Sequence, residues 1–160
     1  MDEDAKRNVL RRVPYGMFVM TAAAGGRATG STLTWISQCS FRPPLVMIAI
    51  QKTSHIHQIV EESRALAVNL LARDQAKIAE AFFHPPEERP GRLGDFAYEA
   101  GPETGAPLLT DLPAWFEARI TDSVVRGDHT VFVAEIVGAG VRDPEVEPLL
   151  LSDTPWKYSG

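Results

Sequence analysis

A hydroxyl-rich segment reads Thr29-Gly30-Ser31-Thr32-Leu33-Thr34-Trp35-Ile36-Ser37-Gln38-Cys39-Ser40-Phe41-Arg42-Pro43-Pro44 and continues into the apolar run Leu45-Val46-Met47-Ile48-Ala49-Ile50. Small hydroxyl residues and two prolines lie here between two runs that resemble β-strands. A surface loop would carry more charge, and a core strand would carry fewer hydroxyl groups. The segment therefore offers short side-chain donors and backbone N–H groups along a buried edge, which suits a flat, polar, phosphorylated ligand.

The rest of the chain alternates short apolar runs with turn residues, a pattern that predicts strands. The expected strands cover residues 15–23, 28–34, 45–50, 65–71, 116–121 and 129–137. The continuous apolar run 45–50 predicts a strand buried on both faces. The run 116–121 alternates instead, which predicts one dry face and one wet face that includes Glu117. Many strands with few helices favour an antiparallel barrel over a doubly wound parallel sheet.

Three short segments carry helix signals, with Asp4, Ser54 and Asp74 as candidate N-caps. The inward-facing residues expected are Val9, Leu10 and Val13 for the first helix, Ile56, Ile59 and Val60 for the second, and Ile78, Ala81 and Phe82 for the third. Residues 84–113 hold six prolines and four glycines. For this part of the chain we expect a long irregular segment that a ligand or partner orders.

Composition limits the class of protein. The 160 residues suffice for a single domain, 1–160, and 44% of them are hydrophobic, as in soluble globular proteins. No apolar run reaches the roughly 18 residues of a membrane span, and the acidic amino terminus lacks a signal peptide's apolar segment, so we expect a cytoplasmic protein without a membrane partner. A net charge of −5 without a basic cluster argues against nucleic acid as a partner. The single cysteine, Cys39, argues against a disulfide or a multi-cysteine metal site.

Four segments together resemble one known family. Residues 30–46 follow the order Gly-x-Thr-x-Thr-Trp-x-x-Gln-x-Ser-x-x-Pro-Pro-Leu-Val, and they precede Ala67-Val68-Asn69-Leu70-Leu71, residues 74–82 and Gly127-Asp128-His129-Thr130-Val131-Phe132. In this order they are similar to the motifs of the flavin reductase-like FMN-binding split barrels. Thr34-Trp35 and Gln38-Cys39 depart from the family's usual Asn-Ser and Ser-Val pairs. This variant is most similar to the flavin reductase modules of diflavin proteins.

The resemblance implies a mainly β fold, an antiparallel Greek-key split barrel with two or three short helices. It implies FMN as the cofactor and NADH or NADPH as the electron donor, bound without a Rossmann unit. His129 is implied as the catalytic residue near the nicotinamide, and the phosphate is expected near the turn at Gln38–Ser40 and near Lys52. The implied cofactor-binding residues are Ser31, Thr32, Leu33, Thr34, Trp35, Ser37, Gln38, Cys39, Ser40, Lys52, Ser54 and Phe83.

Each of these positions also has a purely structural interpretation. The hydroxyl groups can make local hydrogen bonds at strand ends, Trp35 and Phe82 can fill the core, and Lys52 can be a solvated side chain beside an ordinary cap. His129 can be a strand-end histidine bonded to the backbone. Asn69, a polar residue within an apolar strand, is expected to clamp a neighbouring loop.

The predicted function is NAD(P)H-dependent reduction of flavin, with electrons passed to free flavin or to a partner protein. Two alternatives remain: an FMN module that only relays electrons, and a split barrel that binds haem or pyridoxine phosphate. The visible spectrum of the purified protein separates these. A homodimer is expected as well, because a small barrel has too narrow an interior for a flavin. The flavin would then lie in an outer groove that a second copy covers.

Overall fold

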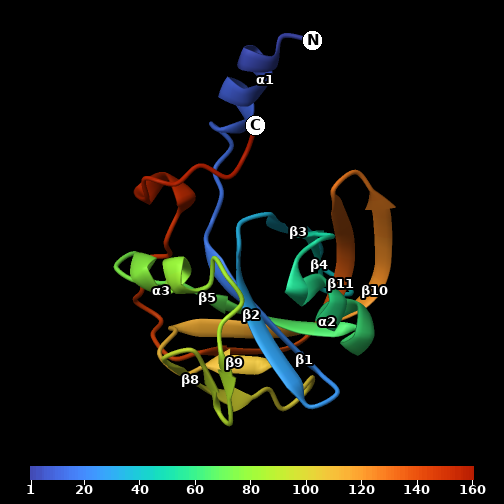
Figure 1. Ribbon diagram of the computed structural model, residues 1–160, viewed down its shortest axis with the longest axis vertical. Helices are drawn as coiled ribbons and strands as arrows, with labels where there is room; N and C mark the ends of the chain where they lie inside the picture. The colour runs from blue at the N-terminus through green and yellow to red at the C-terminus, as the bar shows by residue number, and fades with distance from the viewer.

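Seven antiparallel strands form the main sheet in the computed structural model, which describes residues 1–160 (Figure 1). In spatial order they are β2 (Arg27–Leu33), β1 (Phe18–Ala24), β5 (Ala65–Leu70), β10 (Ala114–Arg126), β11 (His129–Val141), β4 (Leu45–Gln51) and β3 (Ile36–Ser40). Every neighbouring pair is antiparallel. The mainly β, antiparallel architecture predicted from the sequence is therefore confirmed.

The two edge strands of this sheet, β2 and β3, are neighbours in the chain, with only Thr34 and Trp35 between them. Because consecutive Cα atoms are about 3.8 Å apart, the sheet must curl until its edges approach each other at this link. No backbone ladder joins β2 to β3, so closure into a barrel is not shown. A gap remains between the edges, where Ser31 of β2 and Gln51 at the end of β4 line a common cavity.

The concave side of the sheet packs its aliphatic side chains against the helix α2 (His55–Ser63). In β4 the side chains of Val46, Ile48 and Ile50 lie in this core, whereas Met47 is 45% exposed. The expectation of a strand buried on both faces is wrong, because nothing in the structure covers the outer face of β4. The apolar run 45–50 therefore forms a strand whose inner face is buried in the core and whose outer face is apolar but partly exposed.

A second, four-stranded sheet occupies the proline-rich part of the chain. Its strands are β6 (Glu88–Arg89), β7 (Arg92–Leu93), β8 (Phe96–Ala100) and β9 (Pro107–Leu109). The expectation of an irregular segment over residues 84–113 is therefore wrong. Leu93, Leu109 and Leu112 are each at most 1% exposed, and they pack with Met17 and Phe82 in a second core. These leucines order the segment within its own chain.

Asn69 clamps this second sheet to the first, as the sequence predicted. Its amide nitrogen donates to the carbonyl oxygen of Val19 at 3.1 Å, and its amide oxygen accepts from the backbone N–H of Leu109 at 2.9 Å. The side chain is fully buried. One amide thus satisfies backbone groups in both sheets, which neither ladder could satisfy by itself.

Glu117 differs from its expected position on a wet face, because the loop before β9 covers it. It is completely buried, and one carboxylate oxygen accepts from the backbone N–H and the hydroxyl of Thr104 at 2.8 and 2.7 Å. A Cβ at Gly101 would lie 2.0 Å from that oxygen. The loop therefore needs glycine at this point in order to approach the carboxylate.

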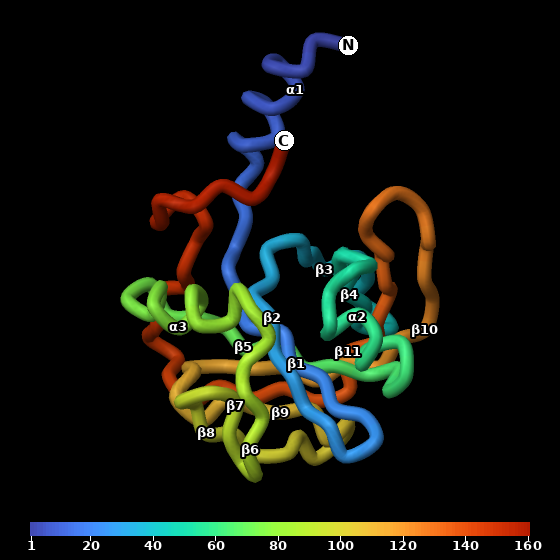
Figure 2. Tube along the Cα trace, viewed as in Figure 1, coloured from blue at the N-terminus to red at the C-terminus, as the bar shows by residue number.

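The first helix, α1 (Glu3–Leu10), projects away from the sheet (Figures 1 and 2). Asp2, and not Asp4, caps it, since its carboxylate accepts from the backbone N–H groups at positions 4 and 5. Val9, Leu10 and Val13 are 64%, 39% and 44% exposed, so their expected burial is wrong. Figure 2 shows α1 next to the C-terminal tail, defined here as residues 155–160, and the Arg11 Nε donates to a tail carbonyl.

The remaining helices are placed much as the sequence predicts. Ser54 caps α2, whose Ile56, Ile59 and Val60 are buried as expected. The third helix, α3 (Ala76–Ala81), begins after Gln75 without a side-chain cap, so Asp74 is not its N-cap. A 3₁₀ turn, η1 (Leu151–Asp153), precedes the tail. No helix in the structure is both long and apolar enough to cross a membrane.

Candidate functional site

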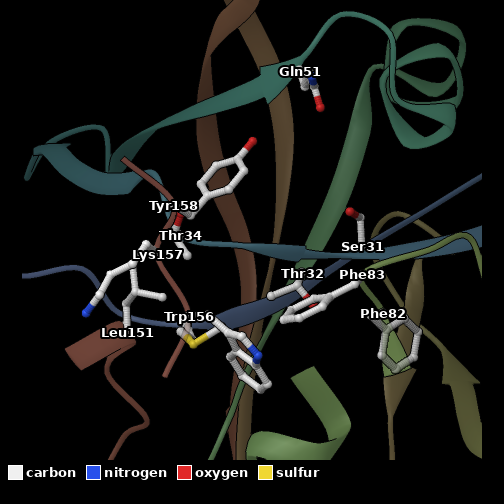
Figure 3. Close-up of a pocket in the computed structure, with 11 residues that line it drawn as sticks. Ser31, Thr32, Thr34, Gln51, Phe82, Phe83, Leu151, Trp156, Lys157 and Tyr158 are labelled. Carbon is white, nitrogen blue, oxygen red and sulfur yellow. The ribbon is translucent and has the colours of Figure 1, made fainter. Parts of the chain in front are cut away.

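A groove follows β2 from the Thr34–Trp35 link to the start of α2 (Figure 3). It consists of three adjoining hollows, all of which Ser31 and Gln51 line. The largest has a volume of about 400 Å³ and is bordered by Trp156 and Tyr158 of the C-terminal tail. The hollow beside α2 has a volume of about 280 Å³. Together they form an elongated site that is wide at one end and reaches a helix N-terminus at the other.

Two polar atoms at the wide end of the groove have no partner within the chain. The hydroxyl oxygen of Thr34 and the indole nitrogen of Trp35 are buried without a hydrogen bond. Thr34 is 6% exposed and lines the largest hollow. Because leaving a buried polar group unpaired costs about 1–3 kcal/mol, such groups usually have a partner. The polar edge of an isoalloxazine ring offers that partner, so the residues present fit a flavin.

Thr32, which lies between Ser31 and Thr34 on the groove wall, is already engaged. Its hydroxyl donates to the carbonyl oxygen of Ala79 at 2.6 Å, and its backbone N–H donates to that of Phe82 at 3.0 Å. These bonds join β2 to the end of α3. The side chain therefore fixes the wall of the groove, in line with the structural interpretation of its hydroxyl.

The narrow end of the groove lies at the start of α2. Ser54 donates its hydroxyl to the carbonyl oxygen of Gln51 at 2.7 Å and accepts from the backbone N–H of His57. Thr53 and His55 line the adjacent hollow. Free N–H groups and the helix dipole favour an anion at a helix N-terminus. No lysine or arginine lines the hollow beside α2, so a phosphate there would rely on hydroxyl and backbone donors.

Five of the predicted cofactor-binding residues lie outside the groove. The ammonium group of Lys52 donates to the carbonyl oxygen of Gly127 at 2.7 Å. The other four, Ser37, Gln38, Cys39 and Ser40, belong to the edge strand β3. The predicted turn at Gln38–Ser40 is therefore wrong. The turn is formed instead by Phe41-Arg42-Pro43-Pro44, which fold β3 back onto β4.

His129 lies next to the groove, against the groove-lining residues Trp35 and Tyr158. The ring centroids of His129 and Trp35 are 4.7 Å apart. The His129 Nδ1 lies 2.7 Å from the Asp128 carboxylate, and the Nε2 lies 3.2 Å from the Tyr158 hydroxyl. The hydrogen bond from His129 lowers the pKa of Asp128, and the charges of His129 and Lys52 add to this effect. His129 is thus bonded to side chains, and not to the backbone as its structural interpretation assumed.

The other predicted residues divide between the groove and the core. Leu33 is 5% exposed, and its side chain belongs to the core below the groove. Phe82 is fully buried, as predicted. Phe83 is 42% exposed and packs edge-on against Trp156, with a centroid distance of 4.7 Å. Ser31, Thr34, Trp35, Ser54 and Phe83 therefore line one groove, although they come from three separate parts of the chain.

Sequence reasoning missed the contribution of the C-terminal tail. Trp156 and Tyr158 both border the groove, yet they follow β11 in a segment without a periodic pattern. Two of the chain's six Trp and Tyr residues occur within three positions there. Aromatic residues clustered in an irregular, polar segment are a signal of a binding surface, and this signal would have identified them.

The family model for the flavin reductase like domain matches residues 10–157. The chain belongs to this family. It is 30% identical over 139 residues to the NADPH-flavin oxidoreductase of Streptomyces viridifaciens, an alignment that covers 86% of this chain and 72% of the relative. The family assignment made from the sequence motifs is confirmed.

Two further comparisons support the same family. The chain is 27% identical to the reductase component of the 4-nitrophenol 4-monooxygenase/4-nitrocatechol 2-monooxygenase of Rhodococcus opacus, over 87% of this chain and 72% of the relative. Among solved structures, the NADH:FAD oxidoreductase of Streptomyces globisporus superimposes with a TM-score of 0.82 and 29% identity. That superposition covers 99% of this chain and 93% of the other. The fold of this flavin reductase therefore matches that of its relatives nearly end to end.

Proposed function

We propose that this protein is an NAD(P)H-dependent flavin reductase, one domain over residues 1–160, that binds FMN in the groove along β2. The observation that carries the proposal is the buried, unpaired hydroxyl of Thr34 in a groove that ends at a helix N-terminus. Family membership and the names of the relatives, which include both NADH- and NADPH-dependent enzymes, support it. A bound flavin supplies two-electron redox chemistry that no side chain of this protein can perform.

In this proposal each part of the groove has a distinct task. Thr34 and Trp35 donate hydrogen bonds to the polar edge of the ring, and Phe83 packs against its apolar portion. Ser31 and Gln51 face the ribityl hydroxyls. The N-terminus of α2, with Ser54 as its cap, binds the phosphate. The groove is then the opening of a split barrel, between β2 and β4.

The unpaired hydroxyl gives a sharp test of ligand placement. Thr34→Val removes a group that the folded protein does not use, so the free energy of unfolding should not fall. Flavin affinity should fall about five- to tenfold, because one hydrogen bond to the ligand contributes about 1 kcal/mol. Titration with FMN and with FAD, followed by fluorescence, measures the affinity and also ranks the two flavins.

Thr32→Val is the matched control, since it makes the same chemical change two residues away. It removes one of the two donors to the Ala79 carbonyl, which also accepts from the backbone N–H of Phe82, and should lower the free energy of unfolding by about 0.5–1.5 kcal/mol. Flavin affinity should change less than it does in Thr34→Val. Equal flavin affinity in wild type and Thr34→Val would contradict the placement of the ring.

The fate of the electrons follows from the same site. The groove is bordered by an irregular tail, in which no backbone–backbone hydrogen bond involves residues 157–160, so a reduced flavin can leave it. One relative is named as the reductase component of a monooxygenase, which supports release of reduced flavin for use by a partner protein. A tightly held module that only relays electrons would instead keep its flavin through gel filtration, and a haem protein would show a Soret band.

We also propose that the protein forms a homodimer through the outer face of β4. Val13, Ile36, Met47 and Val131 line an apolar hollow of about 420 Å³ there, which shares Trp35 with the groove. Phe41, at the end of β3, is 87% exposed. Exposed apolar surface of this kind is typical of an interface, and a two-fold pair is the commonest assembly.

Light scattering at micromolar concentration should report about twice the chain mass of 17.6 kDa. Met47→Asp should shift the protein toward the monomer, because it puts a charge into the proposed interface. Glu99→Asp, on the exposed part of β8, is the control and should leave the mass unchanged. A wild-type monomer would overturn the dimer and leave the assignment of the groove unaffected.

A further inference from the structure

Three side chains from two distant parts of the chain form a continuous series that begins beside the groove and ends at its wide end. Asp128 and His129 lie at the start of β11, and Tyr158 lies on the C-terminal tail. The Asp128 carboxylate is 2.7 Å from the His129 Nδ1, and the Tyr158 hydroxyl is 3.2 Å from the Nε2. Both ring nitrogens of His129 are therefore engaged, one by each neighbour.

The ionised carboxylate of Asp128 fixes the direction of the first of these hydrogen bonds. Hydrogen bonding to His129 lowers the pKa of Asp128, so its carboxylate is ionised and accepts from the Nδ1–H. Burial raises the pKa of Tyr158, and the negative charge of Asp128 adds to this rise. The hydroxyl of Tyr158 therefore keeps its proton and lies within hydrogen-bond distance of the His129 Nε2. The two contacts together hold the imidazole in one orientation, with the Nδ1 toward the carboxylate and the Nε2 toward the phenol.

The aromatic contacts hold the same ring in a single orientation. Trp35 lies 4.7 Å from the His129 ring and 5.4 Å from the Tyr158 ring, measured between centroids. Trp35 also lines the groove, so any movement of these two rings reaches the ligand. The side chain of His129 is 12% exposed, whereas Tyr158 is 47% exposed at the rim.

The tail itself has few other ties to the protein. Its backbone makes one hydrogen bond near its start, from the N–H of Trp156 to the hydroxyl of Thr154. Beyond that point Arg11 donates to the carbonyl oxygen of Ser159, and no backbone–backbone bond involves residues 157–160. The hydrogen bond between Tyr158 and His129 is thus the main polar contact between the end of the tail and the groove.

From these contacts we infer that Tyr158 is a positioning residue for the electron-transfer step, acting through His129. Its hydroxyl holds the imidazole in the orientation in which the ring faces the nicotinamide. The inference rests on the proposed function, because it assigns Tyr158 a task at the same site. It adds a residue from the tail to a site otherwise built by the sheet and α2.

The first test needs neither flavin nor turnover. In ¹H–¹⁵N spectra of the histidine rings, Tyr158→Phe should shift the Nε2 resonance of His129, because that nitrogen loses its hydrogen bond to the phenol. His57 is an internal control, because its Nε2 is bonded to the Thr130 hydroxyl at 2.8 Å, away from the groove. An unchanged His129 resonance would overturn the inference, whatever the activity of the protein.

The second test is a cycle of Tyr158→Phe, His129→Ala and the double variant, measured as the rate of flavin reduction at saturating NAD(P)H. Tyr158→Phe should slow reduction about fivefold, because one hydrogen bond of about 1 kcal/mol is lost, while KM and FMN affinity stay near wild type. The double variant should be no slower than His129→Ala, since Tyr158 acts through the histidine. Additive losses would overturn the inference.

Tyr15→Phe is the matched control, because it removes a tyrosine hydroxyl that bonds to the carbonyl oxygen of Leu10, outside the groove. It should leave both the spectra of His129 and the rate unchanged. If wild type reduces no flavin at all, the proposed function fails, while the spectral test of the contact between Tyr158 and His129 still stands.

Discussion

Phe82→Ala should lower the free energy of unfolding by about 3–5 kcal/mol, the usual loss for a buried phenylalanine. The ring is 1% exposed and packs against Phe96, with the centroids 5.5 Å apart. It also lies directly below β2, where a Cβ at Gly30 would be 2.8 Å from it. The cavity left by alanine would therefore remove the support under the groove as well as core packing. Urea denaturation followed by circular dichroism measures the loss.

The neighbouring residue provides the control for this variant. Phe83 is 42% exposed at the rim of the groove, so Phe83→Ala should change the free energy of unfolding by no more than about 1 kcal/mol. Its effect should appear in flavin affinity instead, because the ring packs against Trp156 beside the proposed flavin site. Equal losses of unfolding free energy in Phe82→Ala and Phe83→Ala would contradict the assignment of Phe82 to the core and of Phe83 to the groove.

Asn69→Leu should be nearly as damaging, with a loss of about 3 kcal/mol or more. Leucine has a similar volume, so the loss comes from polar groups. The backbone N–H of Leu109 and the carbonyl oxygen of Val19 would lose their partner, and each buried, unsatisfied group costs about 1–3 kcal/mol. Because these groups belong to different sheets, the second sheet should also exchange its amide hydrogens faster.

Asn8→Leu is the control for this change, since Asn8 lies on the exposed helix α1 and bonds only to the carbonyl oxygen of Asp4. Its effect on the free energy of unfolding should stay within about 0.5 kcal/mol. A small loss in Asn69→Leu, comparable with that of the control, would show that the second sheet does not depend on the clamp.

Local signals in the sequence predicted local structure correctly. Ser54 caps α2 because a cap needs only its own side chain and the backbone N–H groups of the next residues. Asn69 was predicted as a clamp from a single polar residue in an apolar strand, since a buried amide must find partners. The hydroxyl residues of β2 were predicted to line a site because their number exceeds what a core strand needs.

Errors arose where distant segments decide the outcome. Glu117 lies on the polar face of an alternating strand, but the loop before β9 covers it. Gln38 and Ser40 lie on an exposed edge strand, because pairing with β4 determines their position. The role of Tyr158 depends on a contact with His129, 29 residues earlier in the chain. No local pattern in the sequence encodes these three contacts.

The order in which the strands pair determines when the groove forms during folding. β4 joins the main sheet only through β11, so the two sides of the groove are held in place only after residues 129–141 have paired. Such non-local pairing is typical of slow-folding β proteins. During synthesis, a chain that stops before β11 has both groove-lining strands and yet no groove. The groove is therefore a late product of folding, and a ligand that contacts both of its sides can bind only a chain whose sheet is complete.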